Sequence, residues 1–276
     1  MLPFGFMCYI IVRQKTCRET GGKNAYPACV FFGKAVDRMY EMKSRVRYSE
    51  VGADRKLTLI SLIDYLQDCA TFHSEDLGLG LDYLEEKNMA WVLVSWQIIV
   101  DRYPELGEDI TVQTWAYGFR SFYADRNLVI RGPHDEILAR ANSLWLLINL
   151  DTGHPMKALP EQVEKYGTGP KLDMEYAPRK IKQPEIFENI EPVEVYRHMI
   201  DTNGHMNNGQ YVLIAREMLP QGFSVRQVRT EYKNAAVLGD MLYPKLGRLD
   251  DAYVIRLDNA DGKTFAVVEF RQADQI

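Results

Sequence analysis

The sequence lacks the features that mark several common classes of protein. Its 38 acidic residues outnumber its 33 basic ones, the net charge is −5, and no run of basic residues is interleaved with aromatics. The sequence therefore does not show the basic segments that are typical of nucleic-acid-binding proteins. Only four cysteines occur in 276 residues, without the spacing of a metal site or a disulfide framework. This cysteine usage predicts a reducing, cytoplasmic location.

Cofactor motifs are also missing. The chain shows no nucleotide, flavin or metal motif, and His73 and His154 have no metal-ligand partner at suitable spacing. We interpret His73 as a helix-surface or pocket-edge imidazole and His154 as a turn residue. We expect no cofactor and no metal. What is present is a globular composition, 46% apolar and 26% charged, with ample core material for one large or two ordinary domains.

The first 38 residues are set apart from the rest. Met1 to Val12 is apolar, but no basic residue precedes the apolar run and no small-residue cleavage site follows promptly, so a secretory signal is not indicated. The run is also far shorter than a membrane span. Because the repeated pattern described next begins near Ser44, we expect residues 1–38 to be an extension outside the fold, with Met39 a candidate for the true start.

Hydrophobic periodicity predicts the same order of elements twice, a strand and a helix followed by several strands. In the first half we expect strands and one long helix at 43–48, 58–77 (helix), 90–103, 109–119, 121–132 and 136–150. In the second half we expect them at 192–196, after Asn208 (helix), 225–233, 240–249, 251–258 and 264–272. A long helix wrapped by an antiparallel β-sheet is the hotdog arrangement, so the predicted class is α+β.

A stretch rich in Lys, Pro and Gly separates the two halves and indicates a surface crossover. We therefore divide the chain into an N-terminal domain at 39–163, a linker at 164–191 and a C-terminal domain at 192–276.

One polar loop stands out in the second half, and it runs Asp201-Thr202-Asn203-Gly204-His205-Met206-Asn207-Asn208-Gly209-Gln210-Tyr211. Turn-forming residues are followed by an apolar stretch, which places the polar groups at the start of a helix. An imidazole can take a proton from water near neutral pH, and a carboxamide can polarise a carbonyl. Two simpler interpretations stay open: an Asx-rich helix start, and a histidine that only hydrogen-bonds locally.

This loop resembles the D-x-N-x-H-x-N-N-x-x-Y signature of acyl-acyl carrier protein (acyl-ACP) thioesterases, a family of plant plastids and bacteria. Further matches occur in the same order as in that family: Leu66-Gln67-Asp68 with Ala70 and His73, Val100-Asp101-Arg102-Tyr103-Pro104 with Gly107, Ser143 to Ile148, and Pro160 to Val163. The resemblance runs from about Ser44 to Phe270. Each match alone is weak, and the shared order makes them specific.

The resemblance implies a tandem (double) hotdog, with the active site near the boundary between the domains and the acyl chain bound by the first domain. It implies hydrolysis of the thioester of acyl-ACP, which releases free fatty acid and terminates fatty-acid elongation. The implied catalytic residues are His205 as general base or water-orienting group, Asp201 as its electrostatic support, and Asn203 as a contact to the carbonyl or water. Asn207 and Asn208 are interpreted as cap and loop scaffolding.

The implied partner is acyl carrier protein bearing a phosphopantetheine-linked acyl chain. Four basic linker residues are a candidate docking patch for that acidic partner: Lys171, Arg179, Lys180 and Lys182. An acyl-CoA thioesterase and a non-catalytic acyl-binding hotdog protein remain as alternatives. The protein is expected to be a monomer or a homodimer.

The strand after the second helix departs from the family pattern. Relatives typically read E-Y-x-x-E-C there, whereas this chain reads Glu231-Tyr232-Lys233-Asn234-Ala235-Ala236. A cysteine nucleophile is excluded at that point. An acid partner for His205 would have to be Asp201 or, as the weaker candidate, Glu231. The chain is therefore either a hydrolase that uses water with fewer helpers, which we favour, or a weakened one.

Overall fold

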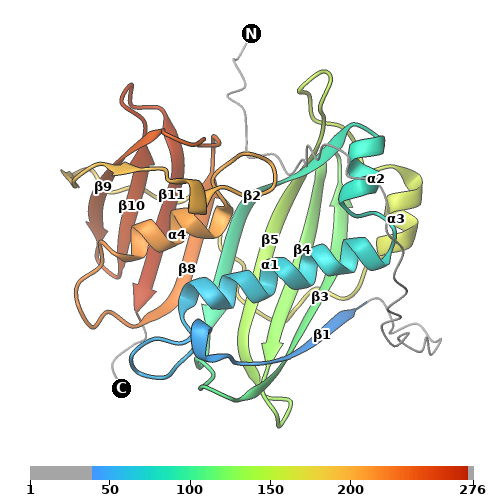
Figure 1. Ribbon diagram of the computed structural model, residues 1–276, viewed down its shortest axis with the longest axis horizontal. Helices are drawn as coiled ribbons and strands as arrows, with labels where there is room; N and C mark the ends of the chain where they lie inside the picture. The colour runs from blue at the N-terminus through green and yellow to red at the C-terminus, as the bar shows by residue number, and fades with distance from the viewer. Residues whose placement is uncertain (1–38, 273–276) are drawn as a thin grey trace.

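The computed structural model describes residues 39–272, which form a continuous antiparallel sheet with helices α1 and α4 on one of its faces (Figure 1). The elements of the first half are β1 (Tyr40–Arg45), α1 (Leu59–Asp76), α2 (Leu81–Glu86), β2 (Met89–Val100), β3 (Asp109–Arg120), β4 (Tyr123–Arg131), β5 (Ile137–Asn149) and α3 (Pro160–Tyr166). Those of the second half are β6 (Phe187–Asn189), β7 (Val193–Glu194), α4 (Asn208–Arg216), β8 (Val225–Tyr232), β9 (Met241–Leu249), β10 (Ala252–Asp258) and β11 (Thr264–Gln272).

The sheet order explains how the two halves are arranged. Across the sheet the strands run β1-β3-β4-β5-β2-β8-β11-β10-β9-β6, and β7 also pairs with β9. The first five strands wrap α1, and the others wrap α4 (Figure 1). The prediction of two hotdog units in one chain is confirmed.

Helix α1 follows from the sequence in a direct way. It begins after Thr58, whose hydroxyl accepts a hydrogen bond from the Ser61 amide at 3.2 Å. Apolar residues at helical spacing form one buried face: Leu59, Leu62, Ile63, Leu66, Cys69 and Ala70. Burial of that stripe holds α1 against the first-half sheet, and the first turn of the helix reaches α4.

The second helix is shorter than the apolar stretch that contains it. The apolar stretch continues to Leu219, but α4 ends at Arg216 and the next residues form turns, with the Leu219 amide bound to the Arg216 carbonyl at 3.1 Å. Pro220 cannot continue a helix and stands directly after that turn. The long helix of the hotdog arrangement is therefore present as α1, with 18 residues, whereas α4 has only 9.

Strands β2 and β8 form the seam between the halves. They pair antiparallel from Ser95 opposite Glu231 to Ile99 opposite Gln227. The two predicted sheets thus join side by side by backbone hydrogen bonds, and no gap separates them.

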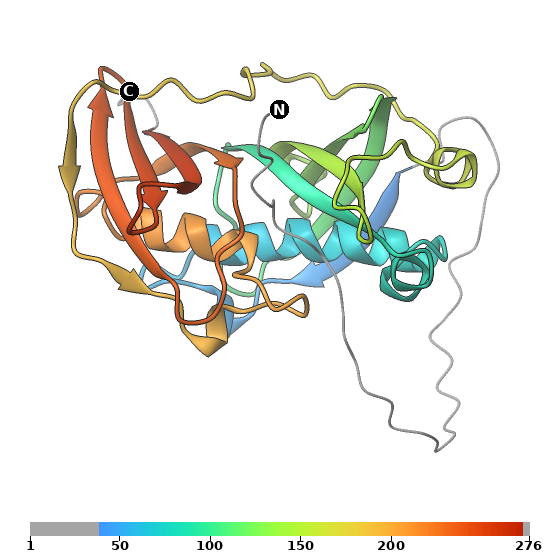
Figure 2. The same ribbon diagram turned by 90° about the horizontal axis from the view of Figure 1, so that it is seen from above.

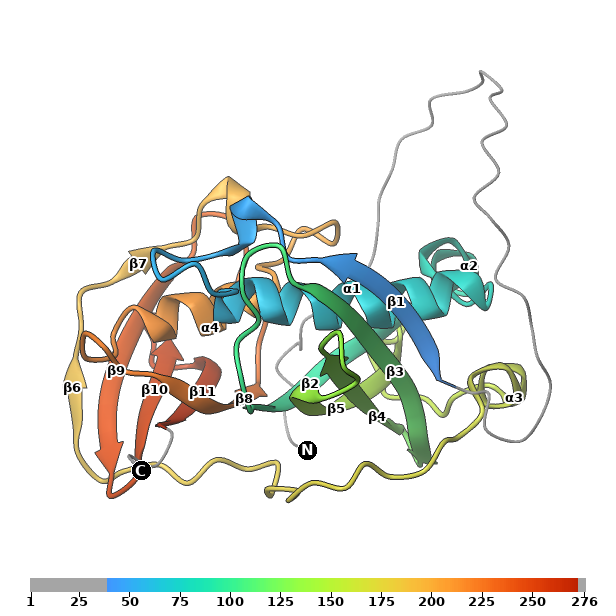
Figure 3. The ribbon, with the colours of Figure 1, turned by 90° about the horizontal axis from the view of Figure 1, so that it is seen from below.

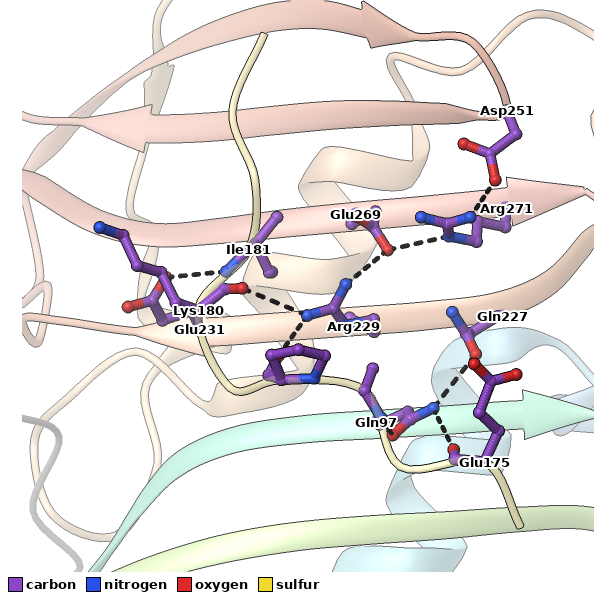
Figure 4. Close-up of polar contacts among 12 residues, drawn as sticks. Gln97, Glu175, Lys180, Ile181, Gln227, Arg229, Glu231, Asp251, Glu269 and Arg271 are labelled. Atoms are coloured by element: carbon purple, nitrogen blue, oxygen red, sulfur yellow. Dashed lines mark hydrogen bonds and ion pairs between the residues drawn. The ribbon is translucent and has the colours of Figure 1, made fainter.

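The linker crosses the sheet face opposite α1 and α4 (Figure 2). Near the seam, polar side chains of strands from both halves hydrogen-bond to the linker backbone (Figure 4). Gln97 of β2 donates to the Glu175 carbonyl and accepts from the Ala177 amide, each at 2.9 Å. Arg229 of β8 donates to the carbonyls of Pro178 and Lys180. The linker is therefore anchored on both sides of the seam.

Several boundaries differ from the sequence expectations. The first strand ends at Arg45, before the predicted 43–48 range is complete, because Glu50 folds the chain into a short turn by accepting a hydrogen bond from the Arg47 amide at 2.8 Å. Helices α2 and α3 and strand β6 were not expected; they are only three to seven residues long, too short for a clear period. The tail of α3 and all of β6 lie in the range assigned to the linker.

The division into domains remains a proposal, and the expected extension at 1–38 lies outside the described residues. Within 39–272, no helix is long and apolar enough to cross a membrane.

Candidate active site

The polar loop is a tight turn between a short 3-10 helix (Arg197–Met199) and α4. Ile200 and Met206 pair as an isolated antiparallel bridge, and the Asp201 amide donates to the His205 carbonyl at 2.8 Å. Gly204 turns the chain with a φ of +76°, a conformation that glycine adopts without strain. The turn therefore brings Asp201 and His205 together, as the sequence hypothesis required.

The Asp201 carboxylate holds this turn from inside. Its Oδ1 accepts hydrogen bonds from the amide of Asn203 at 2.8 Å and from the amide of His205 at 3.3 Å. Burial raises the pKa of the Asp201 carboxyl above its usual value, and these hydrogen bonds and the nearby His205 oppose part of that rise. Asp201 thus positions the loop as well as supplying charge to it.

Asn203 carries an enclosed carboxamide. Neither its oxygen nor its nitrogen meets hydrogen-bond geometry with any group in residues 39–272, although its approach to Asp201 lowers the pKa of that carboxyl. Enclosed polar atoms normally have partners, and the partner nearest to this carboxamide is the Asp201 carboxyl, while the His205 side chain on the same turn is half-buried. Asp201, Asn203 and His205 lie within one turn.

The start of α4 places the loop against the first half. The Asn207 side chain caps the helix by accepting from the Gly209 amide at 2.8 Å, which agrees with its expected scaffolding role. A Cβ at Gly209 would come within 2.8 Å of Ile60 Cδ1, so glycine permits the close approach of α4 to α1. In each overall view the loop before α4 projects from the second half towards the first (Figures 1 and 3).

The segment after β8 lies directly against the loop. The Met206 amide donates to the Ala236 carbonyl at 2.9 Å, and the Ala236 amide donates to the Tyr211 hydroxyl at 2.8 Å. Tyr232 in turn donates to the Asn208 carbonyl at 2.9 Å. The departure from the family pattern therefore falls inside the site, where Ala235 and Ala236 present methyl groups in place of an acid and a thiol.

Glu231 points away from this site. Neighbouring residues of a strand face opposite sides, and Tyr232 faces the loop. The Glu231 carboxylate instead lies under the linker, 3.5 Å from the Ile181 amide and 3.8 Å from Lys233 Nζ (Figure 4). Asp201 remains as the acid beside His205.

A cavity with an empty volume of about 640 Å³, part of it open to solvent, lies in the first half. Its wall is mostly apolar and includes Leu84, Trp91, Phe119 and Trp145. The cavity lies in the domain to which the resemblance assigned the acyl chain, and Trp91 and Trp145 stand in ranges that the sequence predicted as strands. Sequence reasoning missed Arg126, which also lines the cavity, because an arginine within a strand carries no signal of burial.

The interpretation of His73 as a helix-surface residue is wrong, because the side chain is buried. Its Nδ1 lies 3.0 Å from Arg126 Nη1. Burial and the neighbouring Arg126 charge lower the pKa of His73 to about 3, so the ring is neutral near pH 7. No group of His, Cys, Asp and Glu within residues 39–272 could hold a metal ion.

Fold and loop together define the class of the protein, a tandem hotdog with a single Asp-Asn-His turn at the boundary of its halves. Residues 37–166 match the model of the acyl-ACP thioesterase N-terminal domain. The palmitoyl-acyl carrier protein thioesterase of Arabidopsis thaliana is 28% identical over 203 residues, 68% of this chain and 49% of that protein. The corresponding protein of Gossypium hirsutum is 35% identical over 133 residues, 45% of this chain and 32% of that protein.

The crystal structure of an acyl-ACP thioesterase from Bacteroides thetaiotaomicron has a TM-score of 0.79 and 22% identity, and the match covers 86% of this chain and 98% of that one. At that identity the likeness concerns the fold. The sequence match to the acyl-ACP thioesterase family covers residues 37–166, slightly under half of the chain. The chain matches about half, or less, of the length of the two curated plant relatives.

Proposed function

We propose that the protein hydrolyses the thioester of acyl-ACP, releasing the free fatty acid and ending elongation of the chain. The observation that carries this proposal is the turn in which Asp201 binds the His205 amide and the Asn203 carboxamide lies close to the Asp201 carboxyl. These are the groups that a water-dependent acyl transfer needs: a base, a charge beside it and a polar contact for the carbonyl.

In the proposed reaction His205 takes a proton from a water molecule, and the water oxygen attacks the thioester carbonyl carbon. The C–S bond then breaks, and the phosphopantetheine sulfur leaves and takes up a proton as the thiol. The Asn207 side chain accepts a hydrogen bond from the Gly209 amide, and the Asn207 carbonyl accepts one from the Gln210 amide. The Asn208 amide donates no hydrogen bond within residues 39–272. At the positive end of α4, that free N–H is placed to stabilise the oxyanion.

Water is the proposed nucleophile because the described part of the site holds no thiol. Ala235 and Ala236 occupy the segment where relatives carry reactive side chains. Cys69 lies in α1 with its Sγ against the Val112 carbonyl at 3.5 Å, and burial raises the pKa of this thiol to about 12. A thiol with that pKa supplies almost no thiolate at pH 7.

The test is steady-state hydrolysis of a panel of acyl-ACPs and the matching acyl-CoAs. We expect His205→Ala to lower turnover of acyl-ACP by about 10²-fold or more, the usual scale of general acid–base catalysis. His134→Ala is the matched control, since His134 is an exposed histidine in the turn between β4 and β5. Near-wild-type turnover by a folded His205→Ala protein would remove the imidazole from the mechanism.

The same panel separates the alternatives. Preference for acyl-CoA would make the protein a CoA thioesterase, and tight binding of acyl chains without turnover would make it an acyl-binding protein. The family match supports the carrier-protein thioester.

For docking we propose a basic surface, because carrier proteins are acidic and this chain has a net charge of −5. The four basic linker residues named above are the candidate, on the face opposite α4 (Figure 2). Charge reversal at Lys180 and Lys182 should raise KM for acyl-ACP with little effect on kcat. An unchanged KM would indicate that acyl carrier protein docks on the helix side of the sheet instead.

We further propose a cytoplasmic location and a monomeric or homodimeric state. Cys69, the one cysteine within residues 39–272, is free and buried, which agrees with a reducing compartment. Cell fractionation and light scattering test these two points.

A further inference from the structure

Arg126 is a buried arginine that lacks an acid partner. Only 8% of its surface is exposed, and it lines the first-half cavity from β4. Its Nη1 lies 3.0 Å from His73 Nδ1 and 3.1 Å from Thr114 Oγ1. No carboxylate within residues 39–272 forms a salt bridge with it. The similarly buried Arg229, by contrast, pairs with Glu269 at 3.0 Å (Figure 4).

The groups around Arg126 leave its charge uncompensated. His73 is neutral, Thr114 contributes a hydroxyl, and the Tyr166 ring lies 5.4 Å from the guanidinium carbon. The adjacent Asp125 is engaged by Arg120 through two hydrogen bonds of 2.9 Å. An arginine remains charged in proteins, and a buried charge without a counter-charge is costly.

The cavity wall includes the carboxylates of Glu75 and Asp125 besides Arg126, and both are engaged elsewhere. Glu75 accepts the Leu81 amide at 2.9 Å, and Asp125 accepts from Arg120. Arg126 makes its hydrogen bonds to described residues through Nη1, so Nε and Nη2 are uncommitted within 39–272. The indole N–H of Trp91, in the same wall, is enclosed and also has no acceptor among the described groups. The rest of the wall is mainly aliphatic and aromatic, which suits a hydrocarbon chain. The cavity therefore combines an apolar body with a cationic point.

We propose that this cavity receives an acyl chain whose far end carries an oxygen acceptor, a hydroxyl or a carboxylate, and that Arg126 binds this oxygen. The inference rests on the proposed thioesterase function and names the class of acyl group that the enzyme prefers. A plain methyl end would remove water from the guanidinium and return no hydrogen bond. A carboxylate end would in addition neutralise the charge through a bidentate contact.

The experiment compares three acyl-ACPs of equal chain length, ending in a methyl, a hydroxyl or a carboxylate, over a series of lengths. A charge-assisted hydrogen bond corresponds to about tenfold to a hundredfold in kcat/KM. We expect the wild type to favour oxygen-ended chains by that factor. Arg126→Met should abolish the preference, whereas Arg126→Lys should keep part of it. Preference for the carboxylate over the hydroxyl would identify charge neutralisation as the main contribution.

Arg131→Met is the matched control, because Arg131 belongs to the same strand, β4, pairs with Asp135 and does not line this cavity. It should leave the preference unchanged. A wild type that favours methyl-ended chains, or an Arg126→Met variant with the wild-type ratio, would overturn the inference and leave the thioesterase function standing. Failure to hydrolyse any acyl-ACP would instead count against the function itself.

A binding measurement keeps the inference testable if Arg126→Met does not fold. Methyl esters of fatty acids that carry a hydroxyl or carboxylate at the other end are titrated into the wild-type protein, with the plain methyl ester as reference. The ester removes the carboxylate that every free fatty acid would offer to Arg126. Tighter binding of the oxygen-ended esters is expected, and equal binding would contradict the proposal.

Discussion

Asp201 performs two tasks that substitution can separate, namely holding the turn and supplying charge. Asp201→Asn keeps an oxygen at the Oδ1 position and removes the charge, while Asp201→Ala removes both. Because Oδ1 accepts the amides of Asn203 at 2.8 Å and His205 at 3.3 Å, the alanine variant loses two hydrogen bonds and the asparagine variant can retain them.

The magnitudes follow from those two bonds. Hydrogen bonds to a charged group contribute about 1.5–3 kcal/mol, and the 3.3 Å bond belongs at the weak end of that range. We therefore expect Asp201→Ala to lower the free energy of unfolding by about 3–4.5 kcal/mol. Asp201→Asn should lower it by about 1 kcal/mol or less, because burial, which raises the pKa of this carboxyl, no longer opposes a charge.

Urea unfolding and steady-state turnover are measured on both variants. Turnover should fall by about 10²-fold in Asp201→Asn despite its near-normal stability, if the charge assists His205. Asp240→Asn is the control, since Asp240 accepts the Val237 amide at 2.9 Å in a different turn. Wild-type turnover by Asp201→Asn would refute the electrostatic role, and unchanged stability of Asp201→Ala would refute the structural one.

Three further predictions concern buried groups. Because the pKa of His73 is about 3 in the folded protein and about 6.5 in the unfolded chain, the unfolded state binds the extra proton between these values and stability falls as pH falls. Urea unfolding at several pH values should show this loss, up to about 1.4 kcal/mol per pH unit, in the wild type but not in His73→Gln. Alkylation by N-ethylmaleimide, followed by mass spectrometry and activity assay, should leave native Cys69 unmodified, and inhibition through Cys69 would contradict its buried state. Tyr211→Phe removes the acceptor of the buried Ala236 amide, so it should lower the unfolding free energy by about 1–3 kcal/mol; a smaller effect would mean that another group accepts this N–H.

Elements with a strong period could be predicted from the sequence. Helix α1 and strand β11 match their expected ranges almost to the residue, because each carries a sustained apolar pattern. The start of α2 is held by Glu75 of α1, which accepts the Leu81 amide, and the start of α3 by Gln162, which accepts the Leu159 amide; apolar periodicity reveals neither contact. The end of α4 could not be predicted, because apolar residues continue past the helix into a turn.

The candidate site shows the same division. The Asp201 turn could be predicted because its chemistry and its turn residues are contiguous in the chain. The contact of Met206 with Ala236 and the partnership of His73 with Arg126 could not, since each joins residues from different elements. The burial of Arg126 was invisible for a related reason, because its neighbours in sequence include the paired, charged Asp125.

The two halves that pair at the β2–β8 seam belong to one chain, which makes the site insensitive to dilution. In a protein built from two separate hotdog subunits, a site at their boundary would be lost when the subunits dissociate. Here the linker keeps the two edges at a fixed effective concentration, and Gln97 and Arg229 hold it down on either side of the seam. The two halves can also diverge independently, since a substitution in one is not copied into the other. The segment before α1 contains Asp54, Arg55 and Lys56, whereas the segment before α4 contains the histidine turn, so the two halves already differ at this point.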